Sequence, residues 1–194
     1  MTEGAYVHGP NDNDWWIPSG RVFYSMGSLD TPATELAEAQ SHFFMPRRFR
    51  TPFHTQAAPT ESLVTYDYDM LVRETTDPLQ NKVSGTIDYR VLQPNMVMDA
   101  NRNRTMVAFD VLGLVAGTAV MGKPEDVVQQ GDLLDATFIV DLTESQLSSF
   151  EDDPLGNISY TVLGNATSRT VYDLDRFRAT RLANPNDPTK WQPT

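Results

Sequence analysis

The segment Leu63-Val-Thr-Tyr-Asp67 decides the fold, because in it a strand-forming run ends in an aromatic residue followed by aspartate. The same ending recurs at Phe109-Asp110 and Tyr172-Asp173, and a weaker copy lies at Ile87-Asp88. Successive aspartates are 21, 22 and 63 residues apart, and 63 is three times 21. A regular spacing of this size indicates a repeated structural unit.

Two other features of the sequence keep the same phase. A large apolar residue lies five positions after the residue that precedes each aspartate: Leu71, Leu92, Leu114 and Phe177. Two turn-forming segments, Asp77-Pro-Leu-Gln-Asn81 and Asp99-Ala-Asn-Arg-Asn103, begin 11 residues and end 7 residues before the next aspartate of the series. Three features in one phase favour a true repeat over a plain β-sandwich with accidental Tyr-Asp pairs.

Each unit predicts one antiparallel β-hairpin. The aromatic residue is expected to stack on the same position of neighbouring hairpins. The aspartate is expected to end the strand, because its carboxylate can accept a backbone N–H two residues further on. The fifth-position residue is expected to return the chain to the buried face. Because one hairpin cannot bury its apolar face alone, the sequence predicts a mainly β fold in which hairpins stack into a shell or solenoid-like sheet.

Two short helices are predicted outside the hairpins, at about residues 32–44 and 144–151. The first has Thr31 as its N-cap and Pro32 at its first position. Its inner stripe is predicted to consist of Leu36, Ala37, Gln40 and Phe44. The second begins with capping-box spacing between Thr143 and Gln146, and Asp153-Pro154 is expected to end it.

The repeats divide the chain into four predicted segments. Residues 1–61 are an N-terminal strand and helix segment, and residues 62–123 hold the hairpin repeats. Residues 124–168 are an insertion with the second helix, and residues 169–194 hold the last repeat and an open C-terminal tail. Further strands are expected at residues 21–25 and 169–172, which are rich in β-branched and aromatic side chains.

The composition excludes several functions. A formal net charge of −11 over 194 residues disfavours nucleic acid, which attracts basic surfaces, and disfavours anionic lipid. The absence of cysteine excludes disulfides, thiolate metal sites and a cysteine nucleophile. The first residues lack the basic and apolar regions of a cleavable signal, so none is expected. The longest weakly polar stretch, residues 111–122, is too short to cross a bilayer, so no membrane insertion is expected.

No catalytic, cofactor or metal site is predicted. The three histidines lack zinc spacing: His8, His42 and His54. The aspartates of the repeat already have a structural role, which disfavours a carboxylate pair for hydrolysis. The basic cluster of Arg47, Arg48 and Arg50 is expected to pair with nearby carboxylates. Trp15-Trp16 leaves open a site for carbohydrate or a partner protein.

Several phrases of the chain are similar to the Rhs or YD-repeat family: Thr76-Asp-Pro-Leu-Gln-Asn81, Asp88-Tyr-Arg-Val-Leu-Gln-Pro94, Asp99-Ala-Asn-Arg-Asn-Arg-Thr105 and Val107-Ala-Phe-Asp-Val-Leu-Gly113. Others resemble the shell-forming part of the B component of insecticidal toxin complexes: Trp15-Trp-Ile-Pro-Ser-Gly-Arg-Val-Phe-Tyr24, Thr118-Ala-Val-Met-Gly-Lys123, Leu163-Gly-Asn-Ala-Thr167 and Asp187-Pro-Thr-Lys-Trp-Gln-Pro193. The resemblance covers nearly the whole chain.

This resemblance implies a strand-built hollow cocoon, in which the B and C components enclose a toxic effector and a pore component delivers it. The chain would be a strip of the B wall, and its partners would be the remainder of B, the C component and the enclosed effector. It would act outside the cell after a cytoplasmic stage. Gln80 and Arg102 depart from the family by replacing turn glycines, and Leu114 stands where Gly-Arg commonly follows. The short length implies a fragment or a truncated paralogue.

Three hypotheses about function follow. The first is a structural shell segment without catalysis. The second is a stand-alone binding module for carbohydrate or protein that uses Trp15 and Trp16. The third, which the repeat disfavours, is a carboxylate-based hydrolase that uses aspartates such as Asp67 and Asp110.

Overall fold

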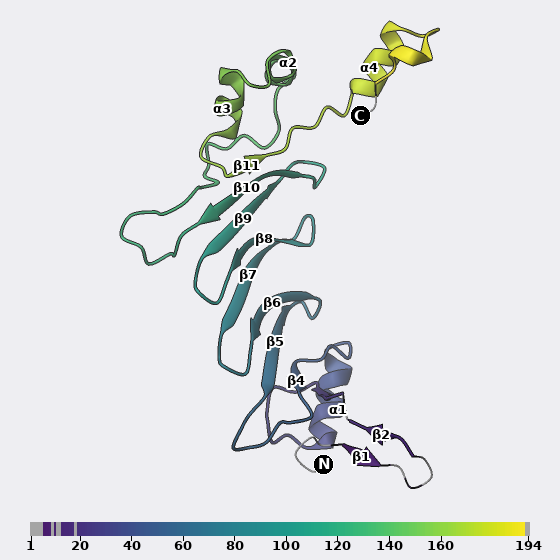
Figure 1. The fold of residues 1–194 in the computed structure, drawn as a ribbon, viewed down its shortest axis with the longest axis vertical. Coiled ribbons are helices and arrows are strands. Elements are labelled where there is room, and N and C mark those ends of the chain that lie inside the picture. Colours follow the sequence, from purple (N-terminus) through teal and green to yellow (C-terminus); the bar gives the residue numbers. More distant parts are fainter. Residues whose placement is uncertain (1–5, 9, 11–12, 18, 193–194) are drawn as a thin grey trace. The chain divides into compact units, whose positions relative to one another are not determined.

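The computed structural model describes residues 6–8, 10, 13–17 and 19–192. The outermost residues of the two predicted terminal segments, 1–5 and 193–194, lie outside the described residues. The chain is mainly β, as predicted, and its hairpins are antiparallel. It divides into two compact units, Met1–Arg102 (unit 1) and Asn103–Thr194 (unit 2) (Figure 1).

The described residues of unit 1 form one helix and a series of antiparallel strands. A small hairpin joins β1 (Val7–His8) to β2 (Trp15–Trp16). The larger sheet follows chain order, with each strand paired to the next: β3 (Arg21–Phe23), β4 (Arg48–Arg50), β5 (Glu61–Asp67), β6 (Leu71–Thr76), β7 (Lys82–Asp88) and β8 (Gln93–Met98). Helix α1 (Pro32–Ser41) lies between β3 and β4 in the sequence.

Unit 2 contains the third of the repeat hairpins and most of the helices that the structure describes. Strand β10 (Val115–Met121) lies between β9 (Arg104–Phe109) and β11 (Ser168–Arg169) and is antiparallel to both. The described helices of this unit are α2 (Glu144–Asp152), α3 (Asn157–Leu163), α4 (Arg176–Ala183) and the 3₁₀ turn η2 (Pro188–Lys190).

The three repeat hairpins, β5–β6, β7–β8 and β9–β10, share one irregularity that makes the repeat visible in three dimensions. On the first strand of each hairpin, the residue before the repeat aspartate is Tyr66, Ile87 or Phe109. Its partner on the second strand directly precedes a β-bulge. The extra residue on each returning strand is Arg73, Asn95 or Ala116. A bulge increases the local twist of a strand pair, so the three hairpins twist at the same step.

A glycine, a phenylalanine and an arginine organise unit 2. A Cβ atom on Gly117 would overlap the ring of Phe138, so only glycine lets this ring lie against β10. The Arg169 guanidinium lies 4.7 Å from the centre of the same ring. It also donates to the carbonyls of Val162 (3.0 Å) and Val140 (3.1 Å). Arg169 therefore ties β11 to the end of α3, whose last carbonyls lack partners within the helix.

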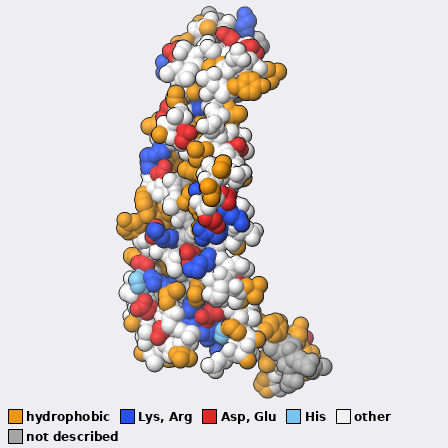
Figure 2. Space-filling view, turned by 90° about the vertical axis from the view of Figure 1, so that its left-hand side faces the viewer, with side chains coloured by type: hydrophobic (Ala, Val, Ile, Leu, Met, Phe, Trp, Pro, Cys, Tyr) orange, Lys and Arg blue, Asp and Glu red, His pale blue; other side chains and the backbone are white. Residues whose placement is uncertain are grey.

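Few apolar side chains are buried in either unit. Among the described residues, unit 2 buries five small or medium apolar ones: Ala116, Ala119, Met121, Val162 and Ala166. In the described part of unit 1, Ala39 is the one buried apolar residue. Large apolar side chains remain at the surface of both units, as the orange atoms of Figure 2 show. Fully buried apolar side chains therefore contribute little to holding unit 1 together.

The first helix differs from its prediction. It ends at Ser41 rather than at residue 44, because Phe43 and Phe44 adopt left-handed φ angles of 53° and 56°. The predicted inner stripe is also wrong, since Leu36 is 54% exposed and Phe44 is 55% exposed. The buried residue of the helix is Ala39, one turn after Glu35, because this face of the helix meets polar groups. Thr31 caps the helix as predicted.

The C-terminal part of the chain differs most. Helix α2 begins with the predicted capping box of Thr143 and Gln146. Helices α3 and α4 are not predicted from the sequence. The predicted strand 169–172 is wrong, since β11 ends at Arg169.

Candidate functional site: hairpin turns and a buried arginine

The repeat aspartates lie at the hairpin turns, but they make different contacts. Asp88 and Asp110 each accept a backbone N–H from the residue two positions on, at 2.9 Å in both cases, as expected for the repeat. The Asp67 carboxylate instead accepts from the Arg73 guanidinium (3.1 and 3.2 Å) and from the Tyr89 hydroxyl (3.0 Å). Asp67 thus joins its own hairpin to the next one.

This junction forms a small cluster, which we call the turn ladder: Asp67, Tyr68, Arg73 and Tyr89. The rings of Tyr68 and Tyr89 meet edge to face with centres 5.6 Å apart. The hydrogen bond that Tyr89 donates to Asp67 raises the pKa of its hydroxyl. Between these two hairpins, an aromatic contact is therefore made one residue after the aspartate, at the turn.

The Asp77 to Asn81 turn is closed by a single carboxylate. Its Oδ1 accepts the backbone N–H groups of Leu79 (2.8 Å) and Asn81 (2.9 Å), and its Oδ2 accepts the Asn81 amide (2.8 Å). The side-chain hydrogen bond from Asn81, followed by its backbone hydrogen bond, lowers the pKa of Asp77. Gln80 adopts a φ of 66°, so a residue with a Cβ occupies a left-handed position.

The same geometry recurs elsewhere. Arg102, at the matching place after Asp99, has a φ of 70°. Asp110 accepts the N–H groups of the residues two and four positions on, and Gly113 has a φ of 85°. The turn that begins at Asp110 is thus built like the Asp77 turn, although the sequence pattern groups Asp110 with Asp67. Asn103 directly precedes β9.

The fifth-position residues do not share one environment. Leu71 begins β6 and is half-buried, opposite Asp67. Leu92 lies in a turn with a φ of 56° and is 55% exposed, and Leu114 is exposed at the end of its turn. The prediction that these residues return to a buried face is therefore wrong for Leu92 and Leu114. For Leu92 a longer loop accounts for the difference, because six residues separate Ile87 from its partner Pro94, whereas five separate the corresponding partners in the first hairpin.

The predicted final hairpin is not formed. Tyr172 and Asp173 lie outside the strands, and Phe177 lies on α4. Tyr172 donates its hydroxyl to the carbonyl of Val115 at 3.2 Å. Asp173 accepts the N–H of Asp175 at 3.1 Å, which is a turn contact that leads into the helix. Spacing alone predicted a strand here, but the pairing with β10 stops at Thr170, which donates its backbone N–H to the Ala116 carbonyl at 3.0 Å. In the described part of unit 2, residues 171–175 are not assigned to a strand.

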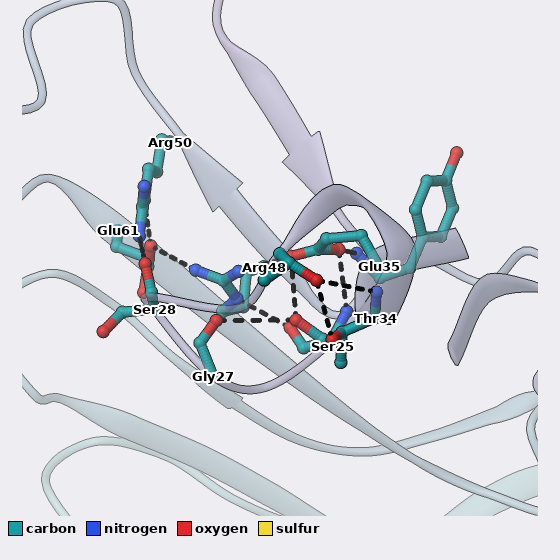
Figure 3. A network of polar contacts seen from close by, with 10 residues as sticks. Ser25, Gly27, Ser28, Thr34, Glu35, Arg48, Arg50 and Glu61 are labelled. Atoms are coloured by element: carbon teal, nitrogen blue, oxygen red, sulfur yellow. Dashed lines mark hydrogen bonds and ion pairs between the residues drawn. The ribbon is translucent and has the colours of Figure 1, made fainter. Parts of the chain in front are cut away.

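The least exposed large side chain of unit 1 is that of Arg48, with 1% exposure (Figure 3). Its guanidinium donates to Glu35 of α1 (2.7 Å) and to Glu61 of β5 (3.1 Å). Its Nε donates to the Ser25 carbonyl (2.6 Å). Arg50 shares Glu61, which completes the arginine network of Ser25, Glu35, Arg48, Arg50 and Glu61. The prediction that the basic cluster pairs with carboxylates is confirmed.

Glu35 binds α1 to the segment after β3. Burial alone raises the pKa of its carboxyl, but hydrogen bonds from the Ser25 backbone and hydroxyl, the Tyr24 backbone and Arg48 outweigh it and lower the pKa to about 2. The Phe23 ring lies 4.6 Å from the guanidinium carbons of both Arg48 and Arg50. The most deeply buried side chains described in unit 1 therefore include members of a polar cluster, Arg48 and Ser25.

The histidines and the remaining basic residue of the cluster have partners of their own. His42 Nδ1 lies 2.7 Å from an Asp69 oxygen, and Arg47 donates to the same oxygen at 3.1 Å. His54 Nδ1 accepts the N–H of Thr60 at 3.0 Å. Within the described residues, no three His, Asp or Glu side chains are grouped as metal ligands would be. No helix among them is long and apolar enough to cross a membrane.

Trp15 and Trp16 lie on the β1–β2 hairpin. Trp16 pairs with Val7 and Trp15 pairs with His8, so the two indoles lie on opposite faces of the hairpin. Trp15 is 51% exposed and Trp16 is 56% exposed. The His8 ring meets Trp15 edge to face at 5.1 Å.

Sequence reasoning missed two groups of residues. The turn ladder had a signal, since Asp-Tyr recurs at Asp67-Tyr68 and Asp88-Tyr89, 21 residues apart. The arginine network had a weaker one, because its partners are 13 residues from Arg48 on either side and belong to different elements.

No protein-family model and no curated protein sequence matches this chain. Solved structures do match it. The crystal structure of TcdB2-TccC3 covers 74% of the chain with a TM-score of 0.55 and 18% identity, and that of TcdB2-TccC3-TEV covers 96% with a TM-score of 0.54 and 15% identity. A Photorhabdus luminescens Tc holotoxin pore covers 96% with a TM-score of 0.49 and 15% identity.

The chain has a fold similar to that of a small part of the TcdB2-TccC3 structures. It spans 6% of the matched TcdB2-TccC3 chain and 10% of the TcdB2-TccC3-TEV chain. At these identities the likeness concerns the fold alone, which is a mainly β arrangement of antiparallel hairpins.

Proposed function

We propose that this chain is a structural segment of a YD-repeat toxin-complex shell that encloses an effector and performs no catalysis of its own. The observation that carries the proposal is the shared register of the three hairpins, each with a bulge beside the repeat aspartate. The fold likeness to TcdB2-TccC3 supports it. The partners proposed are the remaining shell segments and the effector, in a complex released from the cell.

The burial pattern of unit 1 agrees with such a role. A wall segment has neighbours on both sides, so it does not need an apolar core of its own. Val22, Val72 and Val83 are between 40% and 50% exposed on the strands of this unit. Asp67 and Asp88 hold turn contacts, which accounts for them without a catalytic role.

In the described part of the chain, β3 is an edge strand of the larger sheet, which provides a test. An exposed strand edge promotes self-association, and a lysine on it is a common natural safeguard. Sedimentation velocity of the chain at increasing concentration is expected to show association, and Val22→Lys on β3 is expected to reduce it. Val83→Lys on the interior strand β7 is the matched control. A mostly helical monomer at all concentrations, judged also by circular dichroism, would contradict the proposal.

Enclosure of an effector needs a separate experiment. A chimera is made in which this chain replaces the matching part of TcdB2-TccC3. Limited proteolysis then measures how well the chimera protects the effector that the family resemblance implies. Protection comparable to that in the parent complex is expected. A stable complex that leaves the effector open to protease would remove the enclosure part of the proposal and leave the structural part standing.

The exposed indoles favour one alternative, a stand-alone carbohydrate- or protein-binding module. Both tryptophans of the small hairpin offer more than half of their surface to solvent. Binding on a glycan array that is lost in Trp15→Ala would support this function. A blank array together with an unsuccessful pull-down would remove it.

A further inference from the structure

Unit 2 contains an open groove of about 940 Å³ that the shell function does not use. Residues of α2, of α4, of the segment that joins β11 to α4 and of the turn between β9 and β10 line it. Apolar side chains line it, among them Leu147 of α2 and Val171 and Leu174 of the joining segment. A helix is a cylinder of roughly 10 Å diameter with a pitch of about 5.4 Å, so this volume holds about two helical turns.

The charges around the groove are unequal. Six carboxylates and three guanidiniums line it. Arg169 is occupied by the Val140 and Val162 carbonyls, and Arg176 is held by Glu151 at 2.5 Å. Two of the three arginines are thus engaged within the unit.

The acidic side chains on the rim have fewer charged partners, although Asp141 accepts the Val111 N–H at 3.3 Å and its charge acts on Arg169. Among the described residues, no Lys or Arg lies within 4 Å of the carboxylates of Asp141 or Glu144. Asp175 is 79% exposed and lies 3.8 Å from an equally exposed Arg178, a distance at which a surface pair contributes little. The groove therefore combines apolar side chains, among them Leu147, Val171 and Leu174, with negative charge on its rim.

We propose that this groove binds a basic amphipathic helix from another polypeptide. Its apolar stripe would lie against Leu147 and Leu174, and its Lys or Arg side chains would reach Asp141, Glu144 and Asp175. Helix-in-groove recognition uses apolar anchors of this kind, and charges at the rim favour encounter and exclude acidic segments. The proposal does not depend on the shell function, because the groove lies wholly within unit 2.

The test uses the full chain and a fluorescent helical peptide of about four turns, with Leu on one face and Lys on the other. Fluorescence anisotropy is expected to show saturable binding that weakens as salt is raised. The double variant Asp141→Asn with Glu144→Gln is expected to bind about tenfold more weakly. A peptide with Glu in place of Lys is expected not to bind.

The matched control is Asp126→Asn with Asp152→Asn, which removes the same charge from unit 2 without touching the groove lining. Circular dichroism verifies that both double variants fold. Equal loss of binding in the two double variants would overturn the proposal, because it would reduce the effect to net charge. Dimerisation of the chain without peptide, lost in the Asp141 and Glu144 variant, would also overturn it and assign the groove to a second copy.

Discussion

In unit 1 the least exposed large side chain is that of an arginine, whereas in unit 2 the least exposed residues are alanines beside a phenylalanine that lies against a glycine. Both units carry the same bulged hairpin. The hairpin itself therefore does not dictate what lies under it. Charge pairing organises one unit and close packing the other, so the two are expected to respond to different perturbations.

The sharpest test of this contrast is Arg48→Met. It leaves two carboxylates, those of Glu35 and Glu61, without their buried partner. Loss of one member of a buried ion pair costs about 3–5 kcal/mol, and we expect unfolding of unit 1 to become easier by that amount. Urea unfolding followed by hydrogen exchange in β4 and β5 measures it, with β9 and β10 as the internal reference.

A second substitution separates charge loss from packing loss at this site. Glu35→Gln combined with Arg48→Met removes both charges of one pair, so it is expected to recover part of the lost stability. If Arg48→Met leaves β4 and β5 as protected as before, the arginine network does not hold unit 1 together and the contrast between the units fails.

Acid should distinguish the units next. The folded pKa of Glu35 is about 2, below its ordinary value of 4.5. A lowered folded pKa means that the contribution is fully present above about pH 4.5 and is lost as the pH falls towards 2. Because solvent screens this carboxyl, the total is about 1–2 kcal/mol. Urea midpoints of the parent and of Glu35→Gln between about pH 5 and pH 2 should converge. Parallel curves would show that the carboxylate does not carry this effect.

Gly117→Ala perturbs unit 2 instead. The new Cβ would overlap the Phe138 ring, which is held under the Arg169 guanidinium and cannot move without loss of that contact. Overpacking of this kind costs about 1–3 kcal/mol. Hydrogen exchange in β10 should rise while exchange in β4 is unchanged. Phe138→Leu in the same chain should reduce the cost, and strictly additive effects would contradict the contact.

The sequence predicts those parts of the structure that depend on interactions between residues close together in the chain. The strands that end at Asp67, Asp88 and Asp110 are predicted well, because alternation, turn residues and spacing are local and agree with one another. The final repeat at Tyr172-Asp173 satisfies the spacing but lies outside the strands. Residues 176–183, which are mainly Arg, Ala and Leu, follow their own helical preference instead.

The arginine network could not be predicted in detail for the same reason. The sequence shows that Arg48 has carboxylates within reach, but burial of its guanidinium depends on how α1 and β5 approach it in the folded chain. Which of Glu35, Glu38 and Glu61 binds Arg48 is a matter of tertiary structure. The turn ladder lies between these cases, since the repeated Asp-Tyr is visible in the sequence and only its contact needs the fold.

The smallest expected effect concerns a type of turn that occurs in both units, at Gln80 and at Gly113. Gln80 in unit 1 and Gly113 in unit 2 occupy the same left-handed position, with φ angles of 66° and 85°. A side chain with a Cβ is strained there, whereas glycine loses more entropy on folding, so the net preference for glycine is about 0.5–1 kcal/mol. Gln80→Gly should therefore stabilise unit 1, and Gly113→Gln should destabilise unit 2 by a similar amount. Leu79→Gly, one position earlier and without a left-handed φ, should destabilise. Urea midpoints of the three variants measure these changes, and opposite signs for the two exchanges are required if the turn is the same structure in both units.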